Sequence, residues 1–475
     1  MEERKGFRSY FGFLMAAVGS AVGLGNIWGF PFKMGKGGGF AFLLIYLVLA
    51  AVCGAVVMLG ELALGRKTGQ NAVTAYRAVS SRFGWVGALA PVTAMLILSF
   101  YSALGGYCIR YLVLNVGCLF GTEWGANGLS GATVFAEATA DGGMAVVYGM
   151  IFMALTAVIV ALGVRGGIER FCSVGMPLLM AMLAVIILRA CTLPGAAAGL
   201  RFMFVPDFTP LREDFMGVLR TAGGQMFFSL SLAAGVMITY GSYTEKKQHL
   251  ARSAVTIVLC DTAVGLLAGM AVLPAAFALG APESAMQGPA LLFITLQDVF
   301  SGMGQMGFVF GIIFYGLVIL AALASSVSML EVPVAYWTDR QRQKGDKKRR
   351  RWPAVLCLTV LSGALCAITC ADGLGGNGVW VPFQRFFAGA EKIPAFCDCW
   401  LDFLDMLSEG LLMPLGALLT CVMIGWVIKP ETIRAEVEQE DNRFKTYRFY
   451  RICVRYIAPA VIALILWGQI RAFFG

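Results

Sequence analysis

A polar, glycine-rich stretch interrupts the first long apolar run of the sequence. Gly19, Gly23 and Gly25 lie in the run 17–33 (AVGSAVGLGNIWGFPFK), and Asn26 places a side-chain amide beside them. Glycine lets the backbone leave helical geometry, and a membrane core offers no water to the backbone groups that are freed. Freed carbonyl groups can bind a small cation, and the N-terminus of a half-helix can hold an anion. This chemistry is typical of a transporter.

A second interrupted run, 222–243, has small and hydroxyl-bearing residues at its centre, from Ser229 to Gly235. It is the sixth apolar span, which corresponds to the first if spans one to five and six to ten are repeats. Paired interruptions at matching positions predict a binding site near the middle of the membrane. The alternative is that small residues only allow close helix packing. One such run would favour packing, whereas two in register favour a site.

Asp261 is an acid inside an apolar run, 255–269. An ionised carboxylate is costly in hydrocarbon unless it faces a partner or water, so an acid at this depth predicts a functional role. The alternative is a protonated Asp261 whose hydrogen bonds are satisfied by a neighbour.

The elements that must position these residues are membrane-spanning helices. The chain has 475 residues, of which 59% are hydrophobic and 14% charged, which predicts an all-α polytopic membrane protein with about eleven transmembrane helices. We expect a single transporter domain, 1–475, in which two five-helix repeats are inverted and helices 1 and 6 are broken in mid-membrane. The expected repeats are 10–194 and 214–429, followed by an additional helix at 450–474.

The net charge of +9 lies mainly in short loops after the second, fourth, sixth and eighth spans, whereas 118–144 has acidic residues and no Lys or Arg. The positive-inside rule therefore predicts a cytoplasmic N-terminus and, with an odd number of spans, an outside C-terminus. The basic run 340–351 is a topology signal or lipid-facing loop rather than a nucleic-acid site. His249 is the only histidine, and the thirteen cysteines lack metal-ligand spacing. No catalytic constellation lies on matched spans, so the protein is not expected to be an enzyme.

Four motifs together resemble the neurotransmitter:sodium symporter family, in its bacterial amino-acid-transporting branch. They are AVGSAVGLGNIWGFPF, SFYSALGGY, GQMFFSLSLAAGVMITYGSY and ALASSVSMLEVPVAYWTD, in that order along the chain. The similarity covers spans one to ten and includes 192–208, and paired broken helices are a known property of this family. The resemblance implies a multi-pass protein of the bacterial cytoplasmic (inner) membrane.

The resemblance also implies two sodium sites. The first would be formed by Ala21, Asn26, Ser229 and Asp261, and the second by Gly19, Val22, Ala321 and Ser325. Carbonyl, amide, hydroxyl and carboxylate oxygens suit a hard cation such as sodium. Some family members need chloride near the first sodium; Asp261 resembles a built-in anion, which predicts chloride-independent transport.

For the substrate, the resemblance implies that Tyr101 donates its hydroxyl to the carboxylate and that Phe228 covers the pocket as a lid. The remaining pocket residues would be Ser20, Ala21, Gly25, Ile97, Ser229, Ser231, Ala234, Ser325 and Met329. Ala234 replaces a bulky aromatic residue, and methionine is flexible, so we expect a neutral, large hydrophobic or aromatic L-amino acid. Ala233, bulkier than the usual glycine, takes up part of this room. Judged without the family, such residues would indicate ordinary helix packing.

The resemblance also implies a gate at each side of the membrane. Arg4 and Asp339 stand where the family pairs Arg with Asp in the cytoplasmic gate. The family's outer-gate arginine is replaced by Gly29, although its acidic partner, Asp405, is present. Lys33 lies four residues after Gly29 on the same helix face and can reach Asp405, but it lacks the planar fork of arginine. The alternative is that Lys33 only extends its amine to the interface.

Ala324 stands where the family offers Thr or Asp as a ligand of the second sodium. Either one or two sodium ions are therefore expected. The leading hypothesis is sodium-coupled amino-acid import by alternating access, by a monomer or weak dimer in the lipid bilayer, without a nucleic-acid partner. Because Gly29 and Ala324 depart from the family, the alternative is a non-transporting amino-acid binder or sensor with weakened coupling.

Overall fold

The computed structural model describes residues 6–126, 128–278, 289–343, 351–377, 399–440 and 442–474. Every regular element in these ranges is helical, and none of them contains a β-strand. Nine of the described helices are long and apolar enough to cross a membrane, and a bent pair at 10–36 makes a tenth. The predicted all-α polytopic architecture is therefore confirmed. The total of about eleven spans and the division into inverted repeats stay predictions.

The first half of the chain contains five spans. The first consists of α1 (Tyr10–Ala21), η1 (Gly25–Gly29) and α2 (Phe30–Lys36). The second consists of α3 (Phe40–Leu49), η2 (Ala50–Gly54) and α4 (Ala55–Thr68), and the third of η3 (Ser81–Phe83) and α6 (Gly84–Phe120). The fourth is α8 (Gly142–Ala161), and the fifth joins η4 (Val164–Glu169) to α9 (Arg170–Cys191).

The second half starts with a helix in two pieces, α12 (Phe215–Ser229) and α13 (Val236–Gly241), followed by α14 (Leu250–Ala278) and α16 (Gln305–Gln343). The next helix is α17 (Arg351–Ala371) with η7 (Gly373–Gly375). Four elements then form one span: α19 (Trp400–Asp405), η10 (Met406–Leu412), α20 (Met413–Val422) and η11 (Met423–Val427). The last span consists of α22 (Tyr447–Ile452), η12 (Cys453–Ile457) and α23 (Ala458–Phe474).

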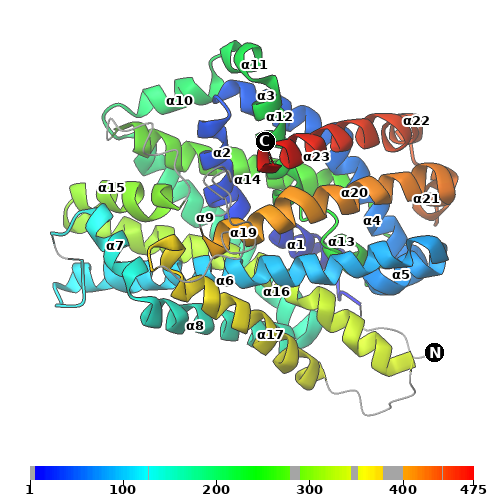
Figure 1. The fold of residues 1–475 in the computed structure, drawn as a ribbon, viewed down its shortest axis with the longest axis horizontal. Helices are drawn as coiled ribbons and strands as arrows, with labels where there is room; N and C mark the ends of the chain where they lie inside the picture. Colours follow the sequence, from blue (N-terminus) through cyan, green and yellow to red (C-terminus); the bar gives the residue numbers. More distant parts are fainter. Residues whose placement is uncertain are drawn as a thin grey trace.

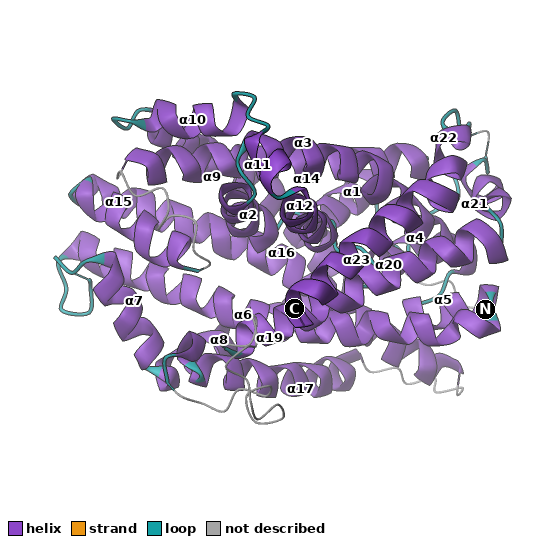
Figure 2. Cartoon of the chain, turned by 45° about the horizontal axis from the view of Figure 1, so that its top comes forward, coloured by secondary structure: helices purple, strands orange, loops and turns teal. Residues whose placement is uncertain are grey.

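Short helices connect the spans. They are α5 (Ala72–Val79), α7 (Gly131–Ala140), α10 (Ala196–Phe204), α11 (Thr209–Glu213), η6 (Leu291–Thr295), α15 (Leu296–Gly302) and α21 (Pro430–Val437). Figures 1 and 2 show α5, α21 and α22 at one end of the molecule and α7, α10 and α15 at the other. Helix α6 packs along α16 in the middle of the bundle.

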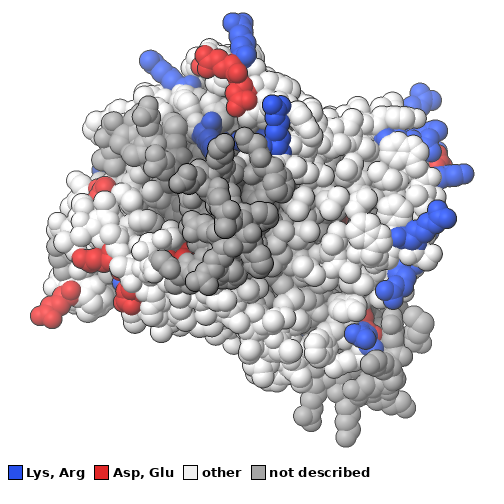
Figure 3. Space-filling view, in the orientation of Figure 1, with Lys and Arg blue, Asp and Glu red and all other residues white. Residues whose placement is uncertain are grey.

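Charged side chains are distributed unevenly between the two ends. In Figure 3, Lys and Arg gather at the end that carries α5, α21 and α22, and a mixed group of basic and acidic side chains surrounds α11. Asp and Glu are prominent around α7 and α15 at the opposite end. This is the asymmetry on which the predicted orientation depends.

The first span leaves helical geometry in the stretch singled out by its glycines. Helix α1 ends at Ala21, and Val22 is extended (φ −76°, ψ 105°) before η1 begins at Gly25. The two parts are bent by 47°. We call this the first break, 22–24.

The second break, 230–235, separates α12 from α13 and contains three left-handed residues. Ser231, Ala233 and Gly235 have φ values of 51°, 59° and 77°. Left-handed geometry costs a non-glycine residue about 1–2 kcal/mol, so the surroundings must hold it in place. Ser231 Oγ donates to the Ser20 carbonyl (3.2 Å), and the Ala233 N–H donates to Glu61 Oε1 (2.9 Å). Contacts with α1 and α4 thus support the strained backbone.

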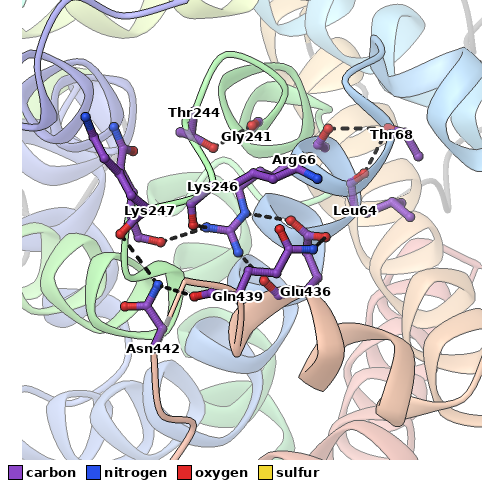
Figure 4. Close-up of polar contacts among 12 residues, drawn as sticks. Leu64, Arg66, Thr68, Gly241, Thr244, Lys246, Lys247, Glu436, Gln439 and Asn442 are labelled. Carbon is purple, nitrogen blue, oxygen red and sulfur yellow. Dashed lines mark hydrogen bonds and ion pairs between the residues drawn. The ribbon is translucent and has the colours of Figure 1, made fainter.

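Figure 4 shows a buried polar cluster that joins α4 to the loop after α13 and to α21. The Arg66 guanidinium donates to Glu436 Oε1 (2.7 Å) and to the carbonyl groups of Gln248 (2.7 Å), Lys246 (3.2 Å) and Glu436. Gln439 Nε2 donates to Glu436 Oε2 (3.0 Å). The side chains of Arg66 and Glu436 are 1% and 3% exposed. This set, the Arg66 cluster, fixes three segments that are far apart in the sequence.

Candidate ion and substrate site

Three helical segments bring polar side chains to Asp261, which is fully buried on α14. Asn26 Nδ2 donates to Asp261 Oδ1 (2.8 Å) and to the Asp261 carbonyl (3.0 Å). Ser229 Oγ lies 2.9 and 3.0 Å from the two carboxylate oxygens, and Tyr46 donates to Oδ2 (3.0 Å). A buried carboxylate is expensive without such partners. The two breaks and α14 therefore meet at one acid.

The predicted ligands of the first sodium are largely assembled by this arrangement. Asn26, Ser229 and Asp261 are in direct contact, and their amide, hydroxyl and carboxylate oxygens are hard donors that suit sodium. Asn26 Oδ1 accepts the Gly23 N–H (3.0 Å), so the amide also spans the first break. Ala21, the fourth predicted ligand, is the buried last residue of α1, directly before that break.

Two neighbours of this site, Tyr46 and Gln225, were not identified from the sequence. Gln225 Nε2 donates to the Gly25 carbonyl (2.7 Å), while its buried Oε1 has no partner among the described residues. Gln225 lies four residues before Ser229, hence on the same helix face, and this amide in an apolar run was a usable signal. Tyr46 lies in the apolar helix α3, where a single sequence does not distinguish it from a packing residue.

The predicted second sodium site lies where α16 meets the end of α1. Ser325 Oγ is 3.3 Å from the carbonyl oxygens of Gly19 and Val22 and 3.1 Å from that of Ser20. A cluster of carbonyl groups around one hydroxyl is chemically suited to a small hard cation.

Ala321 and Ala324 complete the α16 side of this region. Both are fully buried, and Ala321 is one helical turn before Ser325. A β-carbon on Gly19 would lie 3.4 Å from the Ala324 methyl group. A carbon therefore occupies the position from which a Thr or Asp side chain would offer oxygen.

Tyr101, on α6, lies at the first break. Its hydroxyl oxygen accepts the Leu24 N–H (2.8 Å), and the Phe228 ring is centred 6.4 Å from its own ring. A β-carbon on Gly23 would lie 2.3 Å from both the Tyr101 hydroxyl oxygen and Ser325 Oγ, and one on Gly25 would lie 2.9 Å from the Phe228 ring. Gly23 and Gly25 are thus needed for this close packing.

The remaining predicted pocket residues are buried in the same core. Ser231 contacts Ser20 through its hydroxyl, whereas the Ser20 hydroxyl itself is buried without a partner in the described part of the chain. Ile97, Ala234 and Met329 are at most 4% exposed. Their role as a lining for a substrate side chain stays a prediction.

At the other end of the first span, Lys33 forms an ion pair with Glu409 of η10. The sequence predicts Asp405 as the partner of Lys33; Asp405 lies one helical turn before Glu409 and within electrostatic range of Lys33 and Glu409. Glu409 has one more methylene group, which gives its carboxylate a longer reach. Lys33 Nζ also lies 5.6 Å from the centre of the Phe228 ring. Glu409 was missed, although an acid in an apolar span is the signal that identified Asp261.

The predicted cytoplasmic gate is described only on one side, because Arg4 lies outside the described residues. Asn71 donates to Asp339 Oδ2 from its side chain (2.7 Å) and its backbone N–H (3.3 Å). Phe7 packs against Phe13 and Tyr240, with ring centres 5.5 Å apart in both pairs. The pairing of Arg4 with Asp339 stays a prediction.

Comparison with known proteins gives consistent similarities. A family model described as the sodium:neurotransmitter symporter family matches residues 4–123 and 136–393. The uncharacterized sodium-dependent transporter YhdH of Bacillus subtilis is 36% identical over 467 residues, 97% of each chain. An uncharacterized sodium-dependent transporter of Haemophilus influenzae is 29% identical over 475 residues, 98% of each chain. The crystal structure of MhsT in complex with L-phenylalanine superimposes with a TM-score of 0.85 at 34% identity, covering 98% of this chain and 100% of MhsT.

Proposed function

Because the chain belongs to the sodium:neurotransmitter symporter family, we propose that it imports a neutral, large hydrophobic or aromatic L-amino acid together with sodium. The observation that carries this proposal is the meeting of Asn26, Ser229 and Asp261 at the two breaks. The bacterial relatives support a bacterial cytoplasmic membrane as the location, and the charge asymmetry supports a cytoplasmic N-terminus and an outside C-terminus.

In this proposal Asp261 couples the ion to the two broken helices. Sodium binds among Ala21, Asn26, Ser229 and Asp261 and offsets the buried negative charge. Since Asn26 belongs to η1 and Ser229 ends α12, the ion holds both broken helices in one arrangement. Tyr101 and the N-terminus of η1 then receive the substrate carboxylate.

Chloride is not required in this proposal, because the Asp261 carboxylate provides a fixed negative charge at the first sodium site. The second sodium binds weakly, because Ala324 offers no oxygen. Gly19, Val22, Ala321 and Ser325 are then its ligands. One tightly bound sodium accompanies each substrate.

The substrate class is proposed from the pocket residues and from one neighbour. Ala234 is small and Met329 adaptable, which leaves room for a large apolar side chain. L-phenylalanine bound to MhsT supports this class.

The test is uptake into liposomes that contain the purified protein. We expect a sodium gradient to drive accumulation of L-phenylalanine, L-tryptophan or L-leucine, with chloride replaced by gluconate on both sides. A chloride requirement would contradict the role of Asp261. Sodium-dependent binding without accumulation would instead support the amino-acid binder or sensor, which Gly29 and Ala324 favour.

A further inference from the structure

The start of the last span carries a stripe of arginines. Arg448, Arg451 and Arg455 follow one another at intervals of three and four residues through α22 and η12. Residues at these intervals share one face of a helix. We call these three residues the arginine stripe.

An apolar stripe of the same spacing lies beside it. Phe449, Ile452 and Tyr456 are 48%, 53% and 61% exposed. Trp426, on the neighbouring η11, is 48% exposed, and its ring meets that of Tyr456 edge to face with centres 6.2 Å apart. Exposed Trp and Tyr side chains gather at the level of the lipid head groups. The arginine stripe therefore lies at the depth of the lipid phosphates.

The positive charge of the stripe is only partly neutralised by the protein. Arg451 Nε lies 4.0 Å from Glu431 Oε1, which also accepts the Tyr447 hydroxyl (3.0 Å). Arg455 Nε donates to the Gly425 carbonyl (2.8 Å), which holds its guanidinium against η11. Within the described ranges, neither Arg448 nor Arg455 forms an ion pair. At least two guanidinium groups can therefore receive an anion.

We propose that the arginine stripe binds an anionic phospholipid, with the phosphate between the guanidinium groups and an acyl chain along Phe449, Ile452 and Tyr456. Arginine presents a planar fork of donors that matches phosphate oxygens in pairs. The adjoining apolar stripe favours a lipid over a free phosphate, because a lipid brings an acyl chain that can cover these apolar side chains. This site is separate from the substrate pocket and does not depend on which solute is transported.

The site differs from an ordinary excess of basic loop residues. Exposed arginines at the same end of the molecule include Arg77, Arg82 and Arg252, but they come from three separate segments. Spacing along one helix face lets a single phosphate meet several donors at once, whereas Arg77, Arg82 and Arg252 belong to α5, η3 and α14. A variant of these three residues is therefore a control that removes the same charge without removing the proposed site.

The test measures lipid binding by the full-length protein in mixed micelles, by native mass spectrometry with phosphatidylglycerol against phosphatidylcholine. The triple variant R448Q/R451Q/R455Q is expected to lose affinity for phosphatidylglycerol by about tenfold or more, and R77Q/R82Q/R252Q to retain it. The variant R448K/R451K/R455K should be intermediate, because it keeps charge but not the fork.

Equal loss in the control variant, or no loss in R448Q/R451Q/R455Q, would overturn the proposal. Displacement of the lipid by glycerol phosphate at equal concentration would also overturn it, since the site would then bind a free phosphate. If the triple variant does not fold, Arg448→Gln alone, at an exposed position, should still weaken binding about fivefold.

Discussion

At the scale of single residues, the site depends on how many donors Asp261 collects. Asn26, Ser229 and Tyr46 come from three helices and contact a carboxylate that no solvent reaches. A cation placed among these oxygens would replace hydrogen bonds from neutral donors with a direct interaction between opposite charges. That interaction is stronger in the low dielectric of the protein interior. Replacing the acid should therefore change ion binding more than it changes folding.

Asp261→Asn is the corresponding prediction. It should weaken sodium binding by about tenfold or more, because one full charge leaves the site. Part of the affinity should return when chloride is present. The measurement is sodium-dependent thermal stabilisation of the purified protein in chloride and in gluconate, with Asp141→Asn, an exposed helix-capping residue, as the control. Unchanged sodium affinity in Asp261→Asn would argue that the acid is only a protonated packing residue.

Gly23→Ala should weaken substrate binding by about 100-fold while the fold persists. Its methyl group would lie 2.3 Å from the Tyr101 and Ser325 oxygens and would push the Tyr101 hydroxyl away from the break. A shift of about 1 Å at a binding group costs on the order of 100-fold. Gly166→Ala is the matched control, because nothing lies within 4 Å of its β-carbon. Substrate titration by thermal shift measures both, and similar affinities in the two variants would count against the assignment of this pocket.

At the scale of elements, ion pairs join the ends of broken helices to helices far away in sequence. Lys33 and Glu409 connect α2 to η10 and are 16% and 10% exposed. The Arg66 cluster connects α4, the loop after α13 and α21. Separating the partners of a buried ion pair leaves an uncompensated charge inside the protein, which is costly. Both sets therefore constrain which helices can move independently.

Lys33→Ala and Glu409→Gln should each speed the outward loss of bound substrate, because Phe228, the predicted lid of the pocket, lies under this pair. We expect the exchange Lys33→Glu with Glu409→Lys to restore part of the retention. Asp405→Asn should have the smaller effect, since Lys33 pairs with Glu409. Release of labelled substrate from proteoliposomes measures this, with Lys247→Ala, from an exposed pair, as the control. If Lys33→Ala releases substrate at the wild-type rate, the pair is not a gate, and Lys33 only extends its amine to the membrane interface.

Glu436→Gln should reduce the free energy of unfolding by about 3–5 kcal/mol, because it leaves the Arg66 charge buried without its partner. Glu438→Gln removes the partner of Arg434 in an exposed pair and should cost no more than about 0.5 kcal/mol. Unfolding in detergent, followed by circular dichroism, compares the two. Equal losses would show that the Arg66 cluster is not a structural support.

At the scale of the whole molecule, the arrangement has consequences for coupling. The proposed first sodium site touches both breaks and α14, whereas the proposed second site lies between α1 and α16. If Ala324 leaves the second site weak, one sodium dominates the dependence of uptake on sodium concentration.

The Hill coefficient for sodium in amino-acid uptake should therefore be near one. Ala324→Thr adds a hydroxyl beside Gly19 and Ser325 and should raise the coefficient and increase the apparent sodium affinity. Ala322→Ser, a neighbouring buried position on α16, is the control for added polarity. A wild-type coefficient near two would contradict the one-sodium proposal.

The sequence by itself determined that the molecule is a helical membrane protein, and it singled out the first break and Asp261 as the place of the candidate site. Apolar runs of membrane length predict spanning helices whatever their neighbours are, because the bilayer imposes the same requirement on each of them. The glycines at the first break and Asp261 stand out for the same reason. A helix break and a carboxylate each cost free energy in a membrane unless their polar groups have partners. These are local signals, and they can be found without knowing what lies across the helix interface.

Only the tertiary structure decided the partners. Tyr46 and Gln225 join the site from helices whose sequence marks them weakly, and Lys33 pairs with Glu409 rather than with Asp405, one turn away. Arg66 and Glu436 are 370 positions apart and meet inside the protein. Side-chain pairing depends on helix rotation and packing between distant segments. Residue spacing along the chain specifies neither the rotation of a helix nor its packing partner. Hydrophobic periodicity shows which face of a helix is buried, but not which residues of another helix lie against that face.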